Sequence, residues 1–321
     1  EVAAAAAVPA IPAAGPDFTR VAAAAVKGVA NISSIQVVRT PNSPFANDPL
    51  CDPTGEAFFL RDESSGVVWG ATPAPLPRRA DAGRWVIRHS AGVTRYQHAV
   101  AGVVQELAVF VAPDDPVKLA ILTVTNTTEV RKRLGVFGYV EWCLGPPRAG
   151  ERRFVITEMD NDNGRVMLAR NAYNAEFRDR VAFWTATAPP HSYTGDRTEF
   201  IGRNRTLSAP AALFREQLDG RTGAGLDSCG ALQLLVEIEP GQSRRVAFAL
   251  GEGNDRAHAL QLAARYSSIE HVDAALAAVE RTWDDILGAV QIHTPDDSFD
   301  LIVNRWLLYQ TLSCRTWARS G

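Results

Sequence analysis

Apolar and polar residues alternate with a period of two along most of the chain, from Ile35 to Leu250. Turn-forming residues interrupt the alternation roughly every 8 to 15 positions, which is the pattern of short antiparallel strands. It is clearest in three segments, at residues 107–111, 132–140 and 181–185. Because about 215 residues of short strands exceed an ordinary sandwich, the pattern predicts an enlarged one, with two broad sheets face to face.

Two turn sequences within this region predict hairpins. Asn163-Gly164 can supply the two positive φ angles of a type I′ turn. The tetrapeptide Glu239-Pro240-Gly241-Gln242 lies between apolar segments at 232–238 and 246–250, and we expect it to join two paired strands.

The period changes to 3.6 after Gly253. Asp255 is placed to cap a helix that reaches about Tyr266. A second helix carries one continuous apolar stripe, formed by Val272, Leu276, Val279, Trp283 and Ile286 or Leu287. We interpret residues 254–292 as packed linker helices.

A third helix is predicted after Thr294, where Thr-Pro-Asp-Asp forms a capping-box start with Pro295 as the first helical residue. Its apolar residues occupy more than one face, namely Leu301, Ile302, Trp306, Leu308, Tyr309 and Leu312. Such a helix packs among other helices, so residues 293–321 are expected to begin a truncated helical domain. Because exposed apolar patches bind partners, we expect the chain to self-associate through this helix, as a homodimer, in preference to folding the helix back on the sandwich.

Composition limits the classes of function. With 46% hydrophobic and 21% charged residues, the chain has the composition of an ordinary globular protein. Its net charge of −3 provides no positive electrostatic field of the kind that attracts nucleic acids. Lacking an apolar stretch of about 18 residues, it is expected to be soluble and to make no membrane contact. Residues 1–30, rich in alanine and proline, are interpreted as a linker, and 31–253 as the sandwich domain. Both ends of the chain are typical of a piece of a longer polypeptide.

The sequence does not indicate a metal site. The four cysteines are widely spaced, which favours reduced thiols over disulfides or a zinc site: Cys51, Cys143, Cys229 and Cys314. The segment Asp160–Gly164 departs from a calcium loop because its glycine is at the fifth position and no glutamate stands at position twelve. No metal ligand is therefore predicted.

Carbohydrate chemistry is the better candidate. Glu141, Glu158 and Asp160 could serve as a pair of carboxylates for glycoside cleavage, but none is distinguished, and no catalytic residue is assigned. Three clusters, at 69–73, 139–145 and 196–205, place aromatic residues beside arginine, asparagine or acids. Sugar sites combine such groups, and so do core aromatics next to surface charges.

The ordered set of these motifs resembles a known family. It comprises Gly55–Asp62, Val68–Pro73, Tyr139–Leu144, Asp196–Leu207 and Gly220–Asp227. From about Asn31 onward the chain resembles the N-terminal region of the cellobiose/chitobiose phosphorylase family of glycoside hydrolases, and within it the phosphorylase-like portion of cyclic β-1,2-glucan synthases. The resemblance implies a galactose-mutarotase-like β-supersandwich, linker helices, and then a toroid of six helix pairs that carries catalysis.

The resemblance also implies a function. This chain would be a non-catalytic carbohydrate-binding and scaffold portion, inactive alone, of an enzyme that phosphorolyses or transfers β-1,2-linked glucose. Its partners would be β-1,2-glucan or another glucose oligosaccharide and the missing helical barrel. Inorganic phosphate would act only in the complete enzyme, on the cytoplasmic side of an inner-membrane-associated protein. The alternative is a self-sufficient glycoside hydrolase or sugar epimerase on a mutarotase-like sandwich.

The same resemblance indicates which residues would contact sugar. A loop after the Glu-Trp-Cys strand reaches the acceptor subsite in family phosphorylases and matches Gly145–Phe154 here, with Arg148, Arg152 and Arg153. Trp142, Arg203 and Asn204 complete the predicted substrate-binding set.

Overall fold

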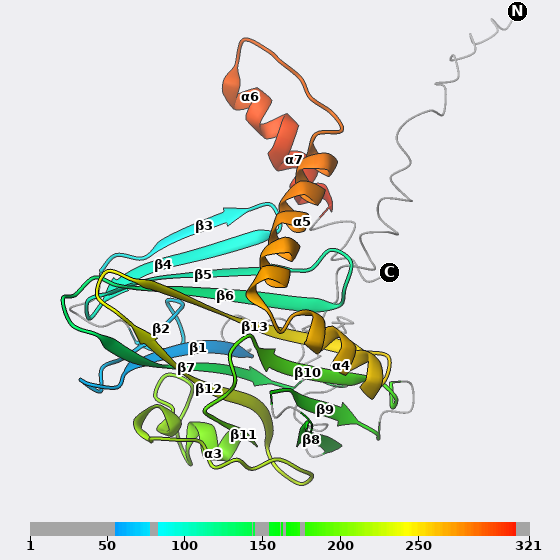
Figure 1. The fold of residues 1–321 in the computed structure, drawn as a ribbon. Coiled ribbons are helices and arrows are strands. Elements are labelled where there is room, and N and C mark those ends of the chain that lie inside the picture. The colour runs from blue at the N-terminus through cyan, green and yellow to red at the C-terminus, as the bar shows by residue number, and fades with distance from the viewer. Residues whose placement is uncertain are drawn as a thin grey trace, which may run out of the picture.

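The computed structural model describes residues 55–77, 83–142, 144, 154–160, 162, 165–173 and 177–312. It contains two antiparallel sheets that face each other (Figure 1). The smaller sheet has five strands, in the order β11 (Ser192–Asp196), β12 (Ser228–Ile238), β7 (Lys132–Glu141), β1 (Glu56–Asp62) and β2 (Val68–Gly70). The larger sheet has eight, in the order β3 (Val86–Ser90), β4 (Val93–Val100), β5 (Val103–Val111), β6 (Val117–Asn126), β13 (Ser243–Gly253), β10 (Val181–Ala186), β9 (Met167–Asn171) and β8 (Val155–Met159). The predicted enlarged two-sheet sandwich is confirmed.

Large aromatic side chains fill the space between the sheets. Phe58 of β1 lies 5.4 Å from Phe248 of β13, and Trp184 of β10 stacks on Phe248 at 5.2 Å between ring centroids. Gly138 of β7 lies directly under these rings, and a Cβ atom there would be 2.7 Å from Trp184. Any side chain at this position would clash with the two rings, so the packing requires glycine.

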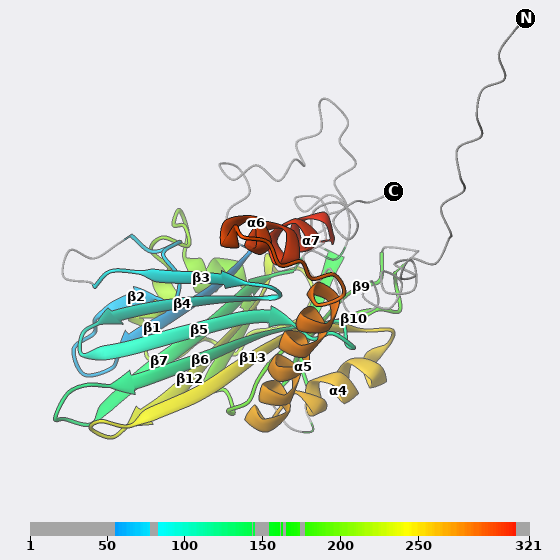
Figure 2. The same ribbon diagram turned by 90° about the horizontal axis from the view of Figure 1, so that it is seen from above.

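Helices cover the outer faces of both sheets. The helices α4 (Arg256–Arg265) and α5 (Ile269–Leu287) pack on the larger sheet, as Figure 2 shows from above. The short helix α3 (Arg197–Ile201) and the 3-10 turn η2 (Ala211–Phe214) cover the smaller one. Central strands such as β7 are consequently buried along almost their whole length.

The turn at Glu239–Gln242 differs from the prediction. It is a tight turn, since Gln242 N donates to Glu239 O at 3.0 Å and Gly241 has a φ of 69°. However, β12 belongs to the smaller sheet and β13 to the larger one, so the two strands do not pair as a hairpin. The turn is a corner where the chain passes from one sheet to the other.

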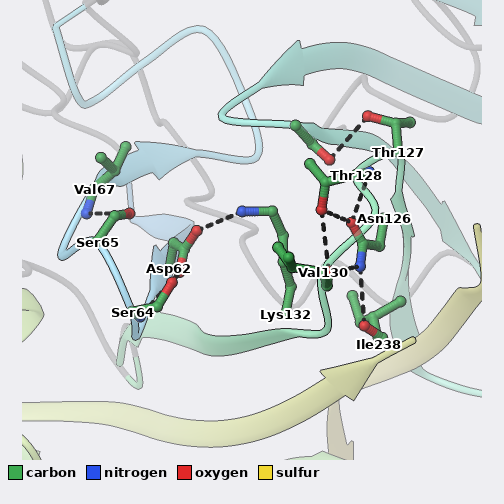
Figure 3. A network of polar contacts seen from close by, with 11 residues as sticks. Asp62, Ser64, Ser65, Val67, Asn126, Thr127, Thr128, Val130, Lys132 and Ile238 are labelled. Carbon is green, nitrogen blue, oxygen red and sulfur yellow. Dashed lines mark hydrogen bonds and ion pairs between the residues drawn. The ribbon is translucent and has the colours of Figure 1, made fainter. Parts of the chain in front are cut away.

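Asn126, at the end of β6, fixes this corner (Figure 3). Its side-chain amide donates to Val130 O at 2.7 Å and to Ile238 O at 3.1 Å, while its oxygen accepts from the Thr128 backbone and hydroxyl. Its own backbone exchanges two further bonds with Gly241 and Gln242. Because both the nitrogen and the oxygen of this buried side-chain amide are hydrogen-bonded, Asn126 holds three chain segments together.

The predicted hairpin around Asn163-Gly164 is present as the antiparallel pair β8–β9, although the two turn residues lie outside the described residues. The two strands pair in the register Met159↔Met167, and the predicted type I′ turn stays a prediction.

The helical predictions after Gly253 hold in their main features. Asp255 caps α4 by accepting from His258 N, and the predicted stripe of α5 is buried at Val272, Val279, Trp283 and Leu287. Among the described residues, no helix combines the length and the apolar character needed to cross a membrane.

The last helical segment begins later than predicted. It consists of α6 (Asp297–Leu301), a π-helical stretch (Ile302–Trp306) and α7 (Leu307–Gln310). Asp296 is the N-cap and accepts from Ser298 N and Phe299 N, so Pro295 precedes the helix instead of opening it. Asp296 is the preferred N-cap because its carboxylate accepts hydrogen bonds from two backbone N–H groups of the first helical turn.

This segment folds back onto α5. Tyr309 contacts Trp283 at 4.9 Å between ring centroids, and Leu308 and Leu312 pack beside it. Trp306 and Leu301 nevertheless stay 58% and 64% exposed. Self-association through these exposed side chains stays a prediction.

Candidate functional site

Four of the sequence motifs converge at the end of β7 where Glu141 lies. The segment at 55–62 forms β1, which pairs with one side of β7, and Gly55 O accepts from Glu141 N at 2.7 Å. On the other side of β7 is β12, followed by β11, which leads into α3. Strand pairing therefore brings the clusters at 139–144, 196–207 and 220–227 together.

A chain of polar contacts runs across this end of the smaller sheet. The Tyr139 hydroxyl donates to Glu141 Oε1 at 3.0 Å, and Arg197 Nε donates to the same oxygen at 2.9 Å. Arg197 Nη1 continues the chain to Asp227 Oδ2 at 3.3 Å. The Glu141 side chain is only 2% exposed, so its charge depends on these donors for stabilisation.

Electrostatics keep the two donors of this chain protonated. Burial raises the pKa of Tyr139, and the neighbouring Cys229 and Glu141 raise it further. For Arg197, burial by itself lowers the pKa, but the hydrogen bond and charge of Glu141 outweigh burial and raise it. Both groups thus act as permanent hydrogen-bond donors and cannot serve as general bases near neutral pH.

Two buried acidic groups lie beside this chain on α3 and β12. Burial raises the pKa of Glu199, while Arg215, 2.6 Å from its carboxylate, opposes the shift. Burial also raises the pKa of the Cys229 thiol, and nearby carboxylates add to the effect. Cys229 is a free cysteine, and its protonated thiol cannot act as a nucleophile in this state.

Asp196 connects α3 to the loop at 219–227. One of its carboxylate oxygens caps α3 by accepting from Thr198 N at 2.9 Å, and the other lies 3.2 Å from Arg221 Nη1. The same loop reaches the larger sheet, because Gly223 exchanges two hydrogen bonds of 3.2 Å with Thr157 of β8. The site therefore spans the edge where the two sheets meet.

The three carboxylates proposed from sequence are all in ion pairs. Glu141 binds Arg197, whereas Glu158 and Asp160 share Arg256 of α4 at 3.0 and 2.9 Å. Glu158 and Asp160 thus tie the hairpin β8–β9 to a helix. Among the described residues, no group of three or more histidine, cysteine, aspartate or glutamate side chains could hold a metal ion.

The predicted sugar-binding residues fall in three different places. Trp142 is 3% exposed and packs in the core between the sheets, so its ring presents no open face for stacking in this structure. Arg203 and Asn204 are exposed on the turn after α3. Arg148, Arg152 and Arg153 lie outside the described residues.

The roles of Tyr139, Arg197, Glu199 and Asp227 in this cluster were not predicted from sequence patterns. A signal for the first was available, because Tyr139 and Glu141 are polar groups two positions apart and therefore on one face of an apolar strand. Arg197, the partner of Glu141, is 56 positions away along the chain, and no local pattern identifies it.

A broad antiparallel sandwich flanked by helices, with a polar cluster where its sheets meet, defines a supersandwich domain. The chain belongs to the glycosyl hydrolase 94 family, because the model described as "Glycosyl hydrolase 94, supersandwich domain" matches residues 34–269. The model of the "Glycosyl hydrolase 94 superfamily, catalytic domain" matches residues 282–321. The resemblance predicted from the motifs is confirmed.

Known relatives support a role connected with carbohydrates. The chain is 36% identical over 283 residues to the cyclic beta-(1,2)-glucan synthase NdvB of Rhizobium meliloti (strain 1021), which covers 87% of this chain and 10% of the relative. It is 26% identical over 273 residues to the N,N'-diacetylchitobiose phosphorylase of Vibrio furnissii, covering 84% of this chain and 34% of that enzyme. A solabiose phosphorylase of Paenibacillus borealis is 24% identical over 267 residues, covering 82% and 34%. The chain thus spans a tenth of the glucan synthase and about a third of these phosphorylases.

Proposed function

We propose that this chain is the non-catalytic, glucan-binding and scaffold portion of an enzyme that acts on β-1,2-glucosidic bonds. The relationship to a cyclic beta-(1,2)-glucan synthase supports the choice of glucan. The observation that carries the non-catalytic role is the pairing of Glu141 with Tyr139 and Arg197. An acid or base for glycoside cleavage must exchange protons with the substrate, and this carboxylate is buried and bound to two donors.

Substrate contacts in this proposal come from residues near the end of β7. Arg148, Arg152 and Arg153 follow that strand in the sequence, and Arg203 and Asn204 are exposed on the turn after α3. Each net hydrogen bond to a sugar hydroxyl contributes about 0.5–3 kcal/mol. A few such contacts on an open surface give millimolar binding.

In the complete enzyme, a helical barrel would supply the catalytic acid, and inorganic phosphate would be the co-substrate of phosphorolysis. The match of residues 282–321 to a catalytic-domain model supports this division of labour. The sandwich would then shape the cleft and orient the glucan.

The test is incubation of the chain with β-1,2-glucan, with and without phosphate, followed by detection of released sugar and glucose 1-phosphate. We expect no turnover, together with millimolar binding of β-1,2-linked glucose oligomers in a chemical-shift titration. Turnover that is abolished by Glu141→Gln or Glu158→Gln, but not by the exposed control Glu129→Gln, would overturn the proposal. That result would instead establish a self-sufficient hydrolase or epimerase.

A further inference from the structure

An exposed aromatic ring lies at the edge of the larger sheet, outside the residues discussed so far. Tyr173, two residues after β9, is 69% exposed, the highest value among the large hydrophobic side chains described. Its ring stacks on that of Phe154, which precedes β8, with 4.2 Å between centroids and 9° between planes. One face of Tyr173 is thus supported by a second ring, while most of the side chain is open to solvent.

The backbone under this pair is fixed. Asn171 is buried, and its side-chain oxygen accepts from Tyr173 N at 3.1 Å. The side-chain nitrogen of Asn171 donates to Leu144 O at 2.8 Å, which ties the end of β9 to the segment that follows β7. Val155 is the ladder partner of Asn171, so Phe154 and Tyr173 leave the same end of the hairpin β8–β9.

The aromatic pair and the polar site are linked through β8 and the loop at 219–227. From Asp227 the loop at 219–227 leads to Gly223, which is hydrogen-bonded to Thr157 of β8. Phe154 precedes β8 and follows Arg153 in the sequence. The hydrogen bond from Asn171 to Leu144 O also ties the end of the hairpin that carries the rings to the chain three residues after Glu141.

Holding a ring in one orientation reduces the entropy cost of binding, because the side chain is ordered before the ligand arrives. Aromatic side chains offer a large apolar face, and the tyrosine hydroxyl adds a polar edge. A glucose ring has the complementary form, with an apolar C–H face bordered by hydroxyl groups. A supported and exposed tyrosine at the edge of a polar site is suited to such a ring.

We propose that Tyr173, supported by Phe154, is a stacking platform for a glucose unit of the bound glucan. This inference rests on the proposed function and adds to it a specific contact, made by the Tyr173 ring and not by the arginine side chains. The ring gives affinity for the sugar face, and the neighbouring polar groups give orientation. Phe214, 67% exposed on η2 over the smaller sheet, is an aromatic side chain without a stacked partner among the ring contacts of the described residues. It provides the matched control.

The experiment is a chemical-shift titration of the whole chain and three variants with a β-1,2-linked glucose oligomer. Stacking contributes about 0.5–1.5 kcal/mol beyond area burial, which corresponds to binding about 2- to 12-fold weaker in Tyr173→Ala. Tyr173→Phe keeps the ring and should bind within about 2-fold of the parent chain. Phe214→Ala should bind like the parent chain.

Each other outcome is decisive. Unchanged affinity in Tyr173→Ala overturns the platform while leaving the proposed function standing. An equal loss in Tyr173→Phe assigns the contact to the hydroxyl, and an equal loss in Phe214→Ala indicates unspecific contact with any exposed ring, so either result overturns stacking at this site. If the parent chain itself does not bind, the proposed function fails and the platform with it.

Discussion

The buried ion pair between Asp62 and Lys132 gives the sharpest test of what stabilises the sandwich. Lys132 Nζ of β7 lies 2.7 Å from Asp62 Oδ2 of β1, and both side chains are buried (Figure 3). The other carboxylate oxygen of Asp62 accepts from the backbone and hydroxyl of Ser64, at 2.9 and 2.6 Å. The pair joins two neighbouring strands at the end of the smaller sheet.

The pKa of Asp62 sets the magnitude of this contribution. Burial by itself raises the pKa, but the hydrogen bonds from Lys132 and Ser64 outweigh burial and lower it from 3.8 to about 2. One pKa unit corresponds to about 1.4 kcal/mol, so these interactions stabilise the fold by about 2–3 kcal/mol. Because the pKa is lower in the folded state, this contribution is complete above about pH 4 and is lost as the pH falls through 2.

Lys132→Met removes the ammonium group and leaves the Asp62 carboxylate buried without its counter-ion. We expect a loss of about 3–5 kcal/mol in the free energy of unfolding at pH 7, measured from urea denaturation followed by circular dichroism. The difference from the parent chain should narrow at pH 3, because the isolated carboxyl then binds a proton. The control Lys118→Met breaks the 2.8 Å ion pair between Lys118 and Glu56, in which both side chains are a fifth or more exposed. It should lower the free energy of unfolding by under about 1 kcal/mol.

Equal losses in Lys132→Met and Lys118→Met, or a difference that stays constant between pH 7 and pH 3, would refute this reasoning. The double variant Asp62→Asn with Lys132→Met removes both charges and should recover much of the stability. If the double variant is as unstable as the single one, the cost lies in packing and not in the unpaired charge.

Three further predictions concern the corner, the core and the last helical segment. Asn126→Ala should lower the free energy of unfolding by about 2–4 kcal/mol in urea titrations, since two carbonyls and a backbone N–H each lose a hydrogen bond. Gly138→Ala forces a methyl group against Trp184 and should cost about 1–3 kcal/mol in the same assay. Truncation after Ile292 should yield a monomer in sedimentation with an unchanged β-sheet spectrum, whereas a full-length chain that sediments as a monomer with Trp306 open to a fluorescence quencher contradicts self-association.

Features fixed by local contacts could be predicted from the sequence. The cap of α4 depends on Asp255 and the N–H three residues later, and the stripe of α5 depends on spacing within one helix. The turn at Glu239–Gln242 was also recognised, because proline and glycine determine its shape. Which strands the turn joins depends on partners over 100 positions away, such as the pairing of β13 with β6, and the tetrapeptide carries no information about them.

The site shows the same limit. The alternating pattern of β7 predicts one buried face, but both faces of the strand are covered in the structure. Trp142 was expected to contact sugar, but its side chain packs between the sheets. Glu141 could be proposed as one of three carboxylates, but only the order β11–β12–β7 brings Arg197 to it. Sequence identified the segments that meet, and the sheet order determines which side chains touch.

The division of the strands between the sheets has a consequence for how the domain assembles. Following the chain, β1 and β2 belong to the smaller sheet, β3 to β6 to the larger, β7 to the smaller, β8 to β10 to the larger, β11 and β12 to the smaller, and β13 to the larger. Neither sheet is built from one continuous stretch of polypeptide, and the last strand inserts between β6 and β10. Assembly must therefore wait for segments far apart in the sequence, which slows folding. During synthesis on the ribosome, the larger sheet can close only after β13 has emerged, so a nascent chain halted before Ser243 exposes the edges of both β6 and β10 to aggregation.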